Sequence, residues 1–189
     1  MSIEAELKAH VRFPAQVREL LCQRAPEEAT TYTDTYYDRP DESLTASGRE
    51  LRVRTITGPH AARTRLTYKD QAVDPASGSK PEYETHAEDP AILDAIFLGL
   101  GYHHLISFQK HCLNYAYTAH KYDLITTLAT VPELDGTFIE IETQVDAPAD
   151  LPHALVAIRT ELAHLGISSE DLTTELYTAA VAKRRGQRH

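Results

Sequence analysis

The sequence predicts an α+β fold in which roughly eight β-strands form a barrel or a strongly curved sheet, with helices beside it. Three observations lead to this prediction. Segments that alternate between apolar and polar residues recur along most of the chain, as expected for strands with one apolar face. Short loops join most consecutive strands, which favours antiparallel pairing. The 189 residues suit one domain over residues 1–189, and so many strands in a domain of this size favour closure or strong curvature.

The first strand is predicted over residues 3–13. Every odd position in this segment is apolar and every even position is polar. A helix is the competing interpretation, because Ala, Glu, Leu and Lys favour helices and Glu4 and Lys8 have the spacing of a helical ion pair. A helix would scatter the apolar side chains around its circumference, whereas a strand places all of them on one side. We therefore predict a strand, with Glu4, Glu6 and Lys8 on its other face.

Further strands are predicted at residues 30–37, 49–57, 63–70, 81–87, 105–118, 121–131 and 137–145. The first of these is rich in β-branched and aromatic residues, which favours a strand. The next two alternate on either side of a loop that contains Gly58 and Pro59. The last two flank Asp135-Gly136, a favoured hairpin turn.

Helices are predicted at residues 14–24, 90–100 and 150–165, with a last helix after Ser168 or Ser169. Prolines near the start and glycines just after the end mark the boundaries of the second and third of these segments. Glu170 and Asp171 would lie in the first turn of the last helix, where carboxylates are favourable. The basic tail at 183–189 is expected to fray.

Composition excludes several classes of protein. The formal net charge of −9 does not favour general nucleic-acid binding, so an anionic ligand would need a local basic cluster. Cys22 and Cys112 form neither a disulfide framework nor a zinc-ligand set. We find no signal peptide and no long apolar run, so no membrane association and a cytoplasmic location are expected. The ten histidines are scattered, and ordinary surface or packing roles are favoured over metal binding.

On six of the predicted strands, the charged side chains fall on one face. The strand at 49–57 carries Arg52 and Arg54 together, and the last strand carries Glu140 and Glu142. A single charged face would ordinarily be exposed to water, but its recurrence on six strands indicates a shared arrangement. The complete set is Lys8, Arg52, Arg54, Arg65, Lys69 and Lys110, with Glu4, Glu6, Glu82, Glu84, Glu140 and Glu142.

In a closed barrel these charged faces point either outward to water or inward to a lumen. A sandwich with salt-bridged outer faces is the simpler interpretation. If helices cover the outside, however, the apolar faces pack beneath them and the charges line the interior. Buried charges are costly unless they are paired or bind a ligand, so such a lumen must hold something ionic. Arginine and lysine suit phosphate oxygens, and paired carboxylates suit a hard cation. The pattern therefore points to a metal-bound polyphosphate.

The sequence resembles the CYTH superfamily, the triphosphate tunnel metalloenzymes, and is most similar to its class IV adenylyl cyclase branch. The resemblance begins with the Glu4-x-Glu6-x-Lys8 strand and extends over nearly the whole chain. Single motifs are weak, but their order is specific. The later motifs are residues 34–38, 44–54, 67–69, 82–84, 137–142 and 165–177.

This resemblance implies an eight-stranded antiparallel tunnel that binds a triphosphate and a divalent metal ion, Mg²⁺ or Mn²⁺. It implies metal binding by Glu4, Glu6, Glu140 and Glu142, with Glu140 and Glu142 the surest. It implies phosphate binding by Lys8, Arg52, Arg54, Lys69 and Lys110. Strand parity, meaning that alternate residues share one face of a strand, adds Arg65, because Arg65 lies on the same face as Lys69. Glu82 and Glu84 would order metal or water. The residues expected to serve catalysis are Glu4, Glu6, Lys8, Glu82 and Glu84.

The expected reaction is conversion of ATP to cyclic AMP and pyrophosphate. The alternatives are hydrolysis of tripolyphosphate, thiamine triphosphate or nucleoside triphosphates, and a binding module that has lost full catalysis. Two departures from the family pattern support the last alternative: Cys112 replaces a basic residue and Ala129 replaces an acidic one. Without tryptophan, any aromatic stacking against a base or a thiazolium ring would have to come from Tyr36, Tyr37 or Phe108. A homodimer is left open.

Overall fold

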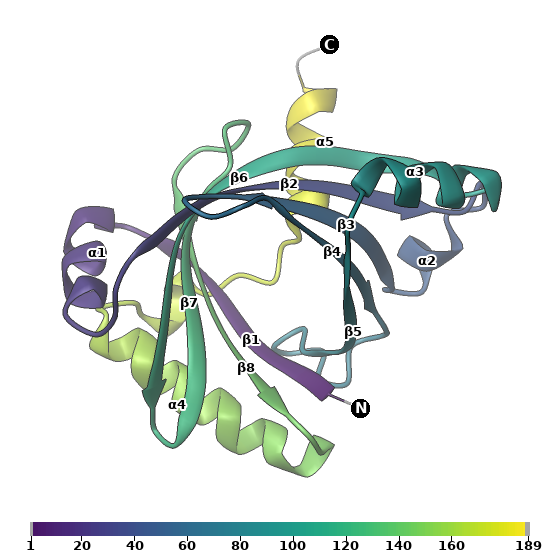
Figure 1. Cartoon of the computed structure of the whole chain (residues 1–189). Coiled ribbons are helices and arrows are strands. Elements are labelled where there is room, and N and C mark those ends of the chain that lie inside the picture. The colour runs from purple at the N-terminus through teal and green to yellow at the C-terminus, as the bar shows by residue number, and fades with distance from the viewer. Residues whose placement is uncertain (1, 188–189) are drawn as a thin grey trace.

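The computed structural model describes residues 2–187, and within them an antiparallel barrel closes in the order β1-β5-β4-β3-β2-β6-β7-β8 (Figure 1). The predicted fold class is therefore confirmed. The strands are β1 (Ser2–Val11), β2 (Glu28–Asp38), β3 (Glu50–Thr57), β4 (Arg63–Lys69), β5 (Lys80–Ala87), β6 (His103–Ala119), β7 (Tyr122–Thr130) and β8 (Thr137–Val145). The helices are α1 (Pro14–Cys22), α2 (Ser43–Ala46), α3 (Pro90–Gly99), α4 (Leu151–His164) and α5 (Tyr177–Gly186).

Strand β1 closes the barrel. It pairs with β8 along its length, from Ile3 opposite Val145 to Val11 opposite Thr137. Its pairing with β5 covers only Ser2 to Glu4. The long β1–β8 ladder therefore determines which side chains of the first and last strands face each other inside the barrel.

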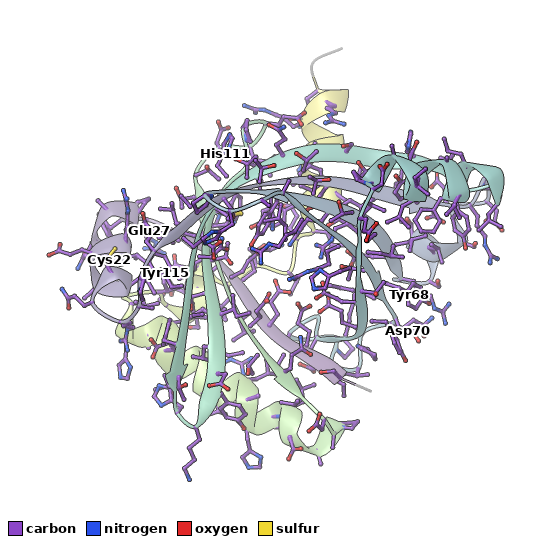
Figure 2. The ribbon with its side chains drawn as sticks, in the orientation of Figure 1. Cys22, Glu27, Tyr68, Asp70, His111 and Tyr115 are labelled. Carbon is purple, nitrogen blue, oxygen red and sulfur yellow. The ribbon has the colours of Figure 1, made fainter. Side chains whose placement is uncertain are left out.

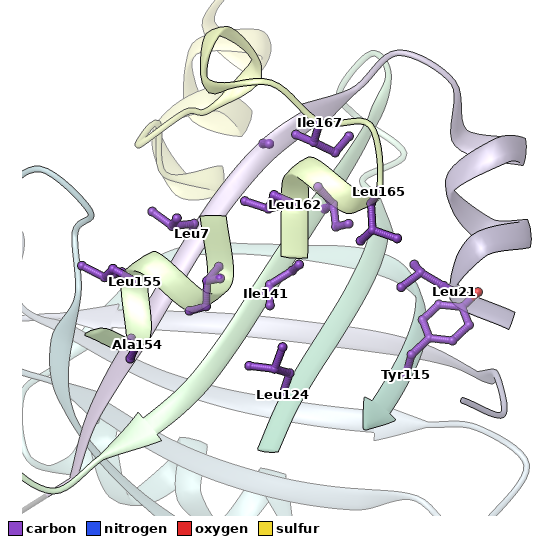
Figure 3. Close-up of a cluster of buried hydrophobic side chains, with 14 of the residues drawn as sticks. Leu7, Leu21, Tyr115, Leu124, Ile141, Ala154, Leu155, Leu162, Leu165 and Ile167 are labelled. Atoms are coloured by element: carbon purple, nitrogen blue, oxygen red, sulfur yellow. The ribbon is translucent and has the colours of Figure 1, made fainter. Parts of the chain in front are cut away.

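The apolar faces of the strands point outward and are covered by helices. Leu7 of β1 and Ile141 of β8 lie beneath Leu155 and Leu162 of α4 (Figure 3). Each such side chain contributes about 1.5–3 kcal/mol when it is fully buried. Since a one-residue slip in register would turn this face inward, the apolar layer under α4 holds the charged face in the interior. The helical interpretation of residues 3–13 and the sandwich alternative are both wrong.

The C-terminal region differs from its prediction. Ser168 and Asp171 form a reciprocal capping box, but it encloses only a 3₁₀ turn at Ser169–Asp171. The chain then runs extended along β1, where Thr173 N donates to Lys8 O at 2.9 Å. Helix α5 begins only at Tyr177 and continues to Gly186, so residues 183–186 are helical rather than frayed. Residues 188–189 of the predicted tail lie outside the described residues. Backbone hydrogen bonding to β1 keeps the segment before Tyr177 extended, so the helix begins later than predicted. Local capping signals in the sequence do not indicate that β1 is the partner of this segment.

Asp38 organises the turn between β2 and β3, where the predicted loop contains the short helix α2. Its fully buried carboxylate accepts hydrogen bonds from the backbone N–H groups of Arg39, Leu44 and Thr45 and from the Thr45 hydroxyl. Burial would raise the pKa of Asp38, but these donors outweigh it and lower the pKa. This carboxylate therefore positions the start of β3. Within residues 2–187, the helices all fall short of the length and apolar character needed to span a membrane.

We expect Asp38→Asn to destabilise the fold by about 1–3 kcal/mol at pH 7, because the amide cannot accept the two hydrogen bonds from Thr45. The carboxylate contribution is fully present above the unfolded pKa of about 3.9 and is lost as the pH falls through the lower folded pKa. Urea unfolding of both proteins should show a difference that shrinks below about pH 4. The control Asp146→Asn, at an exposed position, should stay within about 0.5 kcal/mol of the parent. A difference that is independent of pH would contradict this role.

Candidate active site

The twelve charged residues predicted to share a lumen line one cavity with a volume of about 300 Å³. Figure 2 shows side chains with nitrogen and oxygen tips crowded inside the barrel. Further lining residues include Tyr36, Glu50, Lys80 and Tyr177. The cavity thus gathers carboxylates and cations from β1, β3, β4, β5, β6 and β8.

Three carboxylates converge on one wall of this cavity. Oxygens of Glu4, Glu6 and Glu142 lie within 4.8 Å of one another. Glu6 and Glu142 are direct partners across the β1–β8 ladder, an arrangement that is unfavourable between like charges. Burial and the charge of Glu4 raise the pKa of Glu6 to about 7, and burial with Glu4 and Glu6 raises the pKa of Glu142 well above its ordinary value. A cluster of this chemistry fits a hard divalent cation.

Lys69 neutralises part of this carboxylate wall. Its Nζ contacts Glu4 and lies 3.9 Å from Glu6. Another carboxylate, Glu82, lies 3.8 Å from the same nitrogen. Burial alone would lower the pKa of Lys69, but Glu4 and Glu6 outweigh it and hold the pKa well above its ordinary value. Burial, although opposed by Lys69, raises the pKa of Glu82 to about 7.

Glu140 lies on the cationic side of the cavity. Its carboxylate is 3.1 Å from Lys110 Nζ and it pairs across the ladder with Lys8. Burial would raise its pKa, but Lys110 and Lys8 lower the pKa of Glu140 to about 2. The Nζ atoms of Lys8 and Lys110 lie 4.4 and 4.5 Å from the centre of the Tyr177 ring. Glu140 therefore neutralises lysines here, and its expected metal-binding role stays a prediction.

The two arginines of β3 have different surroundings. Arg54 donates from Nε and Nη2 to the fully buried Asp34, at 2.6 and 2.7 Å. Burial disfavours both charges, yet each holds the other ionised: the pKa of Asp34 is lowered and that of Arg54 is raised. Arg52 donates from Nη2 to Thr67 Oγ1 at 3.4 Å, but its buried Nε has no hydrogen-bond partner among the described residues. Arg52 therefore keeps a donor that is available to an anion.

Arg65 and Glu84 lie at a more exposed part of the cavity and pair with each other. Arg65 Nη1 lies 3.2 Å from Glu84 Oε2, and each side chain is about one-third exposed. Thr67 also donates to Glu84 at 2.9 Å. Strand parity thus placed Arg65 in the cavity, but its phosphate-binding role stays a prediction.

Several functional candidates escaped the sequence analysis. Asp34 lies on the lumen face of β2, and Glu50 and Lys80 pair at 2.6 Å inside the cavity. Parity could have revealed Glu50, which stands two residues before Arg52 on the same face. Lys80 lies one residue before the predicted start of its strand. Tyr177 begins a helix, so no strand pattern could have placed it in the barrel.

The two departures from the family pattern lie side by side. Cys112 of β6 and Ala129 of β7 are cross-strand partners, and both are buried. Burial raises the pKa of the Cys112 thiol to about 12. Beside them, Asn114 accepts hydrogen bonds from the Tyr32 and Thr127 hydroxyls, both at 3.0 Å. An uncharged layer therefore adjoins the cationic side of the cavity.

The three aromatic residues expected to stack against a base are buried. Tyr37 packs between Phe97 and His104, with ring centres 5.0 and 5.3 Å away. Tyr36 and Phe108 stack on each other at 5.9 Å. Tyr36 also lines the charged cavity, so the expectation that one of the three stacks against a base stays a prediction.

Comparison with solved structures supports the fold. PH1819 from Pyrococcus horikoshii superposes with a TM-score of 0.82 at 24% identity, covering 96% of this chain and 99% of that one. A candidate adenylate cyclase from Vibrio parahaemolyticus gives 0.79 at 18%, covering 95% and 98%. HpAC1 from Hippeastrum, a candidate adenylyl cyclase described as having dominant triphosphatase activity, gives 0.67 at 17%, covering 97% and 96%. At these identities the likeness shows a shared fold.

Comparison with curated proteins finds no match. The CYTH domain model matches residues 2–177, which is most of the chain. That match agrees with the charged tunnel and with the order of motifs along the strands. The chain therefore belongs to the CYTH domain family.

Proposed function

We propose that this protein is a divalent-metal-dependent enzyme that acts on a triphosphate held in the tunnel. The observation that carries the proposal is the division of one cavity into two sides. Glu4, Glu6 and Glu142 converge on one side, and Lys8 and Lys110 lie with Tyr177 on the other. Its family implies divalent metal use and triphosphate binding.

The lining of the cavity supports a triphosphate as the bound group. Its volume is about 300 Å³, and Lys8, Arg52 and Lys110 are among the cations that line it. Ammonium and guanidinium groups suit phosphate oxygens.

The carboxylate cluster fits the metal on chemical grounds. Oxygen ligands are those that Mg²⁺ and Mn²⁺ prefer, and Glu4, Glu6 and Glu142 would hold the ion. When bound, such an ion supplies Lewis-acid stabilisation of negative charge on phosphate oxygens. Glu140 keeps its predicted place as a further ligand, provided that its contact with Lys110 is released.

The cations would orient the phosphates and stabilise the charge that develops during reaction. Arg52 brings an unpaired guanidinium nitrogen, and Lys8 and Lys110 bring ammonium groups to the same cavity. Because the barrel already fixes these groups, they need little reorganisation to stabilise that charge. Asp34 keeps Arg54 in place and offsets its positive charge, so Arg54 contributes mainly through its fixed position at the cavity wall.

Hydrolysis is the reaction that this geometry supports best. A water nucleophile needs only that the triphosphate be held, and Glu82, whose pKa is raised to about 7, is our candidate to accept a proton from it. Cyclisation of ATP remains the second candidate, because the sequence resembles the cyclase branch. Cyclisation also requires the ribose to be held near the α-phosphorus, and of the three aromatic residues expected to help, Tyr36 lines the cavity whereas Tyr37 and Phe108 do not.

Product analysis separates these reactions. We expect the purified protein, supplied with Mg²⁺ or Mn²⁺ and tripolyphosphate, ATP or thiamine triphosphate, to release orthophosphate and a diphosphate product. Cyclic AMP with pyrophosphate from ATP would instead establish the cyclase. Tight binding without turnover of any of the three would leave a binding module.

Glu142→Gln should lower metal-dependent kcat/KM by at least about 100-fold, because it removes a carboxylate from the metal cluster. Raising the Mg²⁺ or Mn²⁺ concentration should restore part of the activity. The exposed control Glu88→Gln should behave like the parent. Undiminished activity in both Glu142→Gln and Glu140→Gln would rule out the tunnel as the active site.

Arg52→Gln should raise the apparent KM for triphosphate by about 10–100-fold, which corresponds to the loss of one charged hydrogen-bonding group of about 1.5–3 kcal/mol. Steady-state kinetics of Arg52→Gln and the exposed control Arg63→Gln would measure this effect. Arg54→Ala is a poorer test, because it leaves Asp34 buried and unpaired at a cost of about 3–5 kcal/mol in stability. An unchanged KM in Arg52→Gln would show that this guanidinium does not bind substrate.

A further inference from the structure

A second cluster of potential metal ligands lies outside the tunnel, where the β6–β7 turn meets the end of α4. Residues Glu161 and His164 stand three positions apart on α4, and His120 lies in the turn. Figure 1 places this turn and α4 side by side at the lower part of the barrel. None of these three residues lines the charged cavity.

The spacing of the three ligand atoms matches tetrahedral coordination. His120 Nε2 lies 3.4 Å from Glu161 Oε2, and His164 Nδ1 lies 3.7 Å from the same oxygen. All the ligand atoms fall within 4.8 Å of one another. A tetrahedral zinc ion with bonds of about 2.0–2.1 Å separates its ligands by about 3.3 Å. These atoms therefore need only a small inward movement to share one ion.

Glu161 has a buried oxygen that nothing else satisfies. The side chain is fully buried, and its Oε2 has no hydrogen-bond partner among the described residues. The distances to the two imidazoles exceed the usual 2.7–3.2 Å range of an N–H···O hydrogen bond. A buried carboxylate oxygen left in this state is unfavourable, so a cation at this point would complete its coordination.

The other carboxylate oxygen is held in place. Glu161 Oε1 accepts a hydrogen bond from the Tyr117 hydroxyl at 3.0 Å and lies 3.1 Å from Arg24 Nε. Contacts of this kind orient a ligating carboxylate. They leave Oε2 directed towards the two imidazoles.

We propose that His120, Glu161 and His164 bind one zinc-type divalent ion, with a fourth position open to water. Two imidazoles and a carboxylate suit zinc and its neighbours in the transition series, whereas the tunnel offers only oxygen ligands of the kind that Mg²⁺ and Mn²⁺ prefer. Because His120 lies on the β6–β7 turn, the ion would cross-link this turn to α4. The site is thus independent of the proposed catalytic function.

The competing explanation is a purely ionic cluster in which protonated imidazoles face Glu161. Arg24 already supplies Glu161 with one positive partner. The imidazole rings of His120 and His164 stack with centres 5.8 Å apart and an interplanar angle of 27°, so two charged rings would repel each other. A shared metal ion keeps both rings neutral.

Zinc titration of the metal-stripped full chain tests the proposal. Excess Mg²⁺ fills the tunnel carboxylates, and calorimetry then measures Zn²⁺ binding to the parent, His120→Asn, His164→Gln and the control His153→Gln. Asparagine suits position 120 because it tolerates the left-handed backbone found there, with φ of 53°. His153 is exposed on the same helix α4 and takes no part in the cluster.

We expect one Zn²⁺ per chain in the parent and in His153→Gln, and at least about 100-fold weaker binding in His120→Asn and His164→Gln. Zn²⁺ should also raise the unfolding temperature of the parent and of His153→Gln, but not of the other two variants. Glu142→Gln should keep this zinc binding, which separates the site from the tunnel. No zinc binding by the parent, or equal affinity in all four proteins, would overturn the proposal.

Discussion

Two carboxylates that face each other across the β1–β8 ladder place the strongest constraint on this structure. Glu6 and Glu142 are paired in register and half-buried, an arrangement that is unfavourable without a nearby cation. They are held there by the opposite faces of the same strands, where residues such as Leu7 and Ile141 pack under α4. The hydrophobic layer outside the barrel thus enforces the charged layer inside it.

Negative and positive side chains gather on different sides of the lumen, which suits a ligand that carries both a cation and anionic groups. Carboxylates gather around Lys69 on one side, and Lys8 and Lys110 share Glu140 and the Tyr177 ring on the other. A metal-bound polyphosphate has the complementary arrangement, with a cation at one point and anionic oxygens along the rest. Because the barrel fixes these charges before binding, the proposed reaction would require little reorganisation.

The predicted fold and the predicted charged set came from one simple property. Alternation with a period of two separates the faces of a strand, so the twelve residues that line the cavity could be identified without knowing any strand order. Parity does not say which residues touch across the barrel. The family resemblance implied metal binding by both Glu140 and Glu142, but the ladder places Glu140 against Lys8, and its carboxylate lies 3.1 Å from Lys110. For the same reason, nothing in the sequence indicated that Cys112 and Ala129 are neighbours.

The sequence alone determined which strand faces are charged and that the chain makes about eight strands. Tertiary structure decided which carboxylates converge, which arginine of β3 lacks a carboxylate partner within residues 2–187, and where the last helix begins. These features depend on partners far apart in the chain: Arg54 on Asp34, Thr173 on the backbone of β1, and Tyr177 on the lysines of β1 and β6. Local pattern encodes the direction of a side chain, whereas only closure of the barrel brings distant side chains within reach of each other.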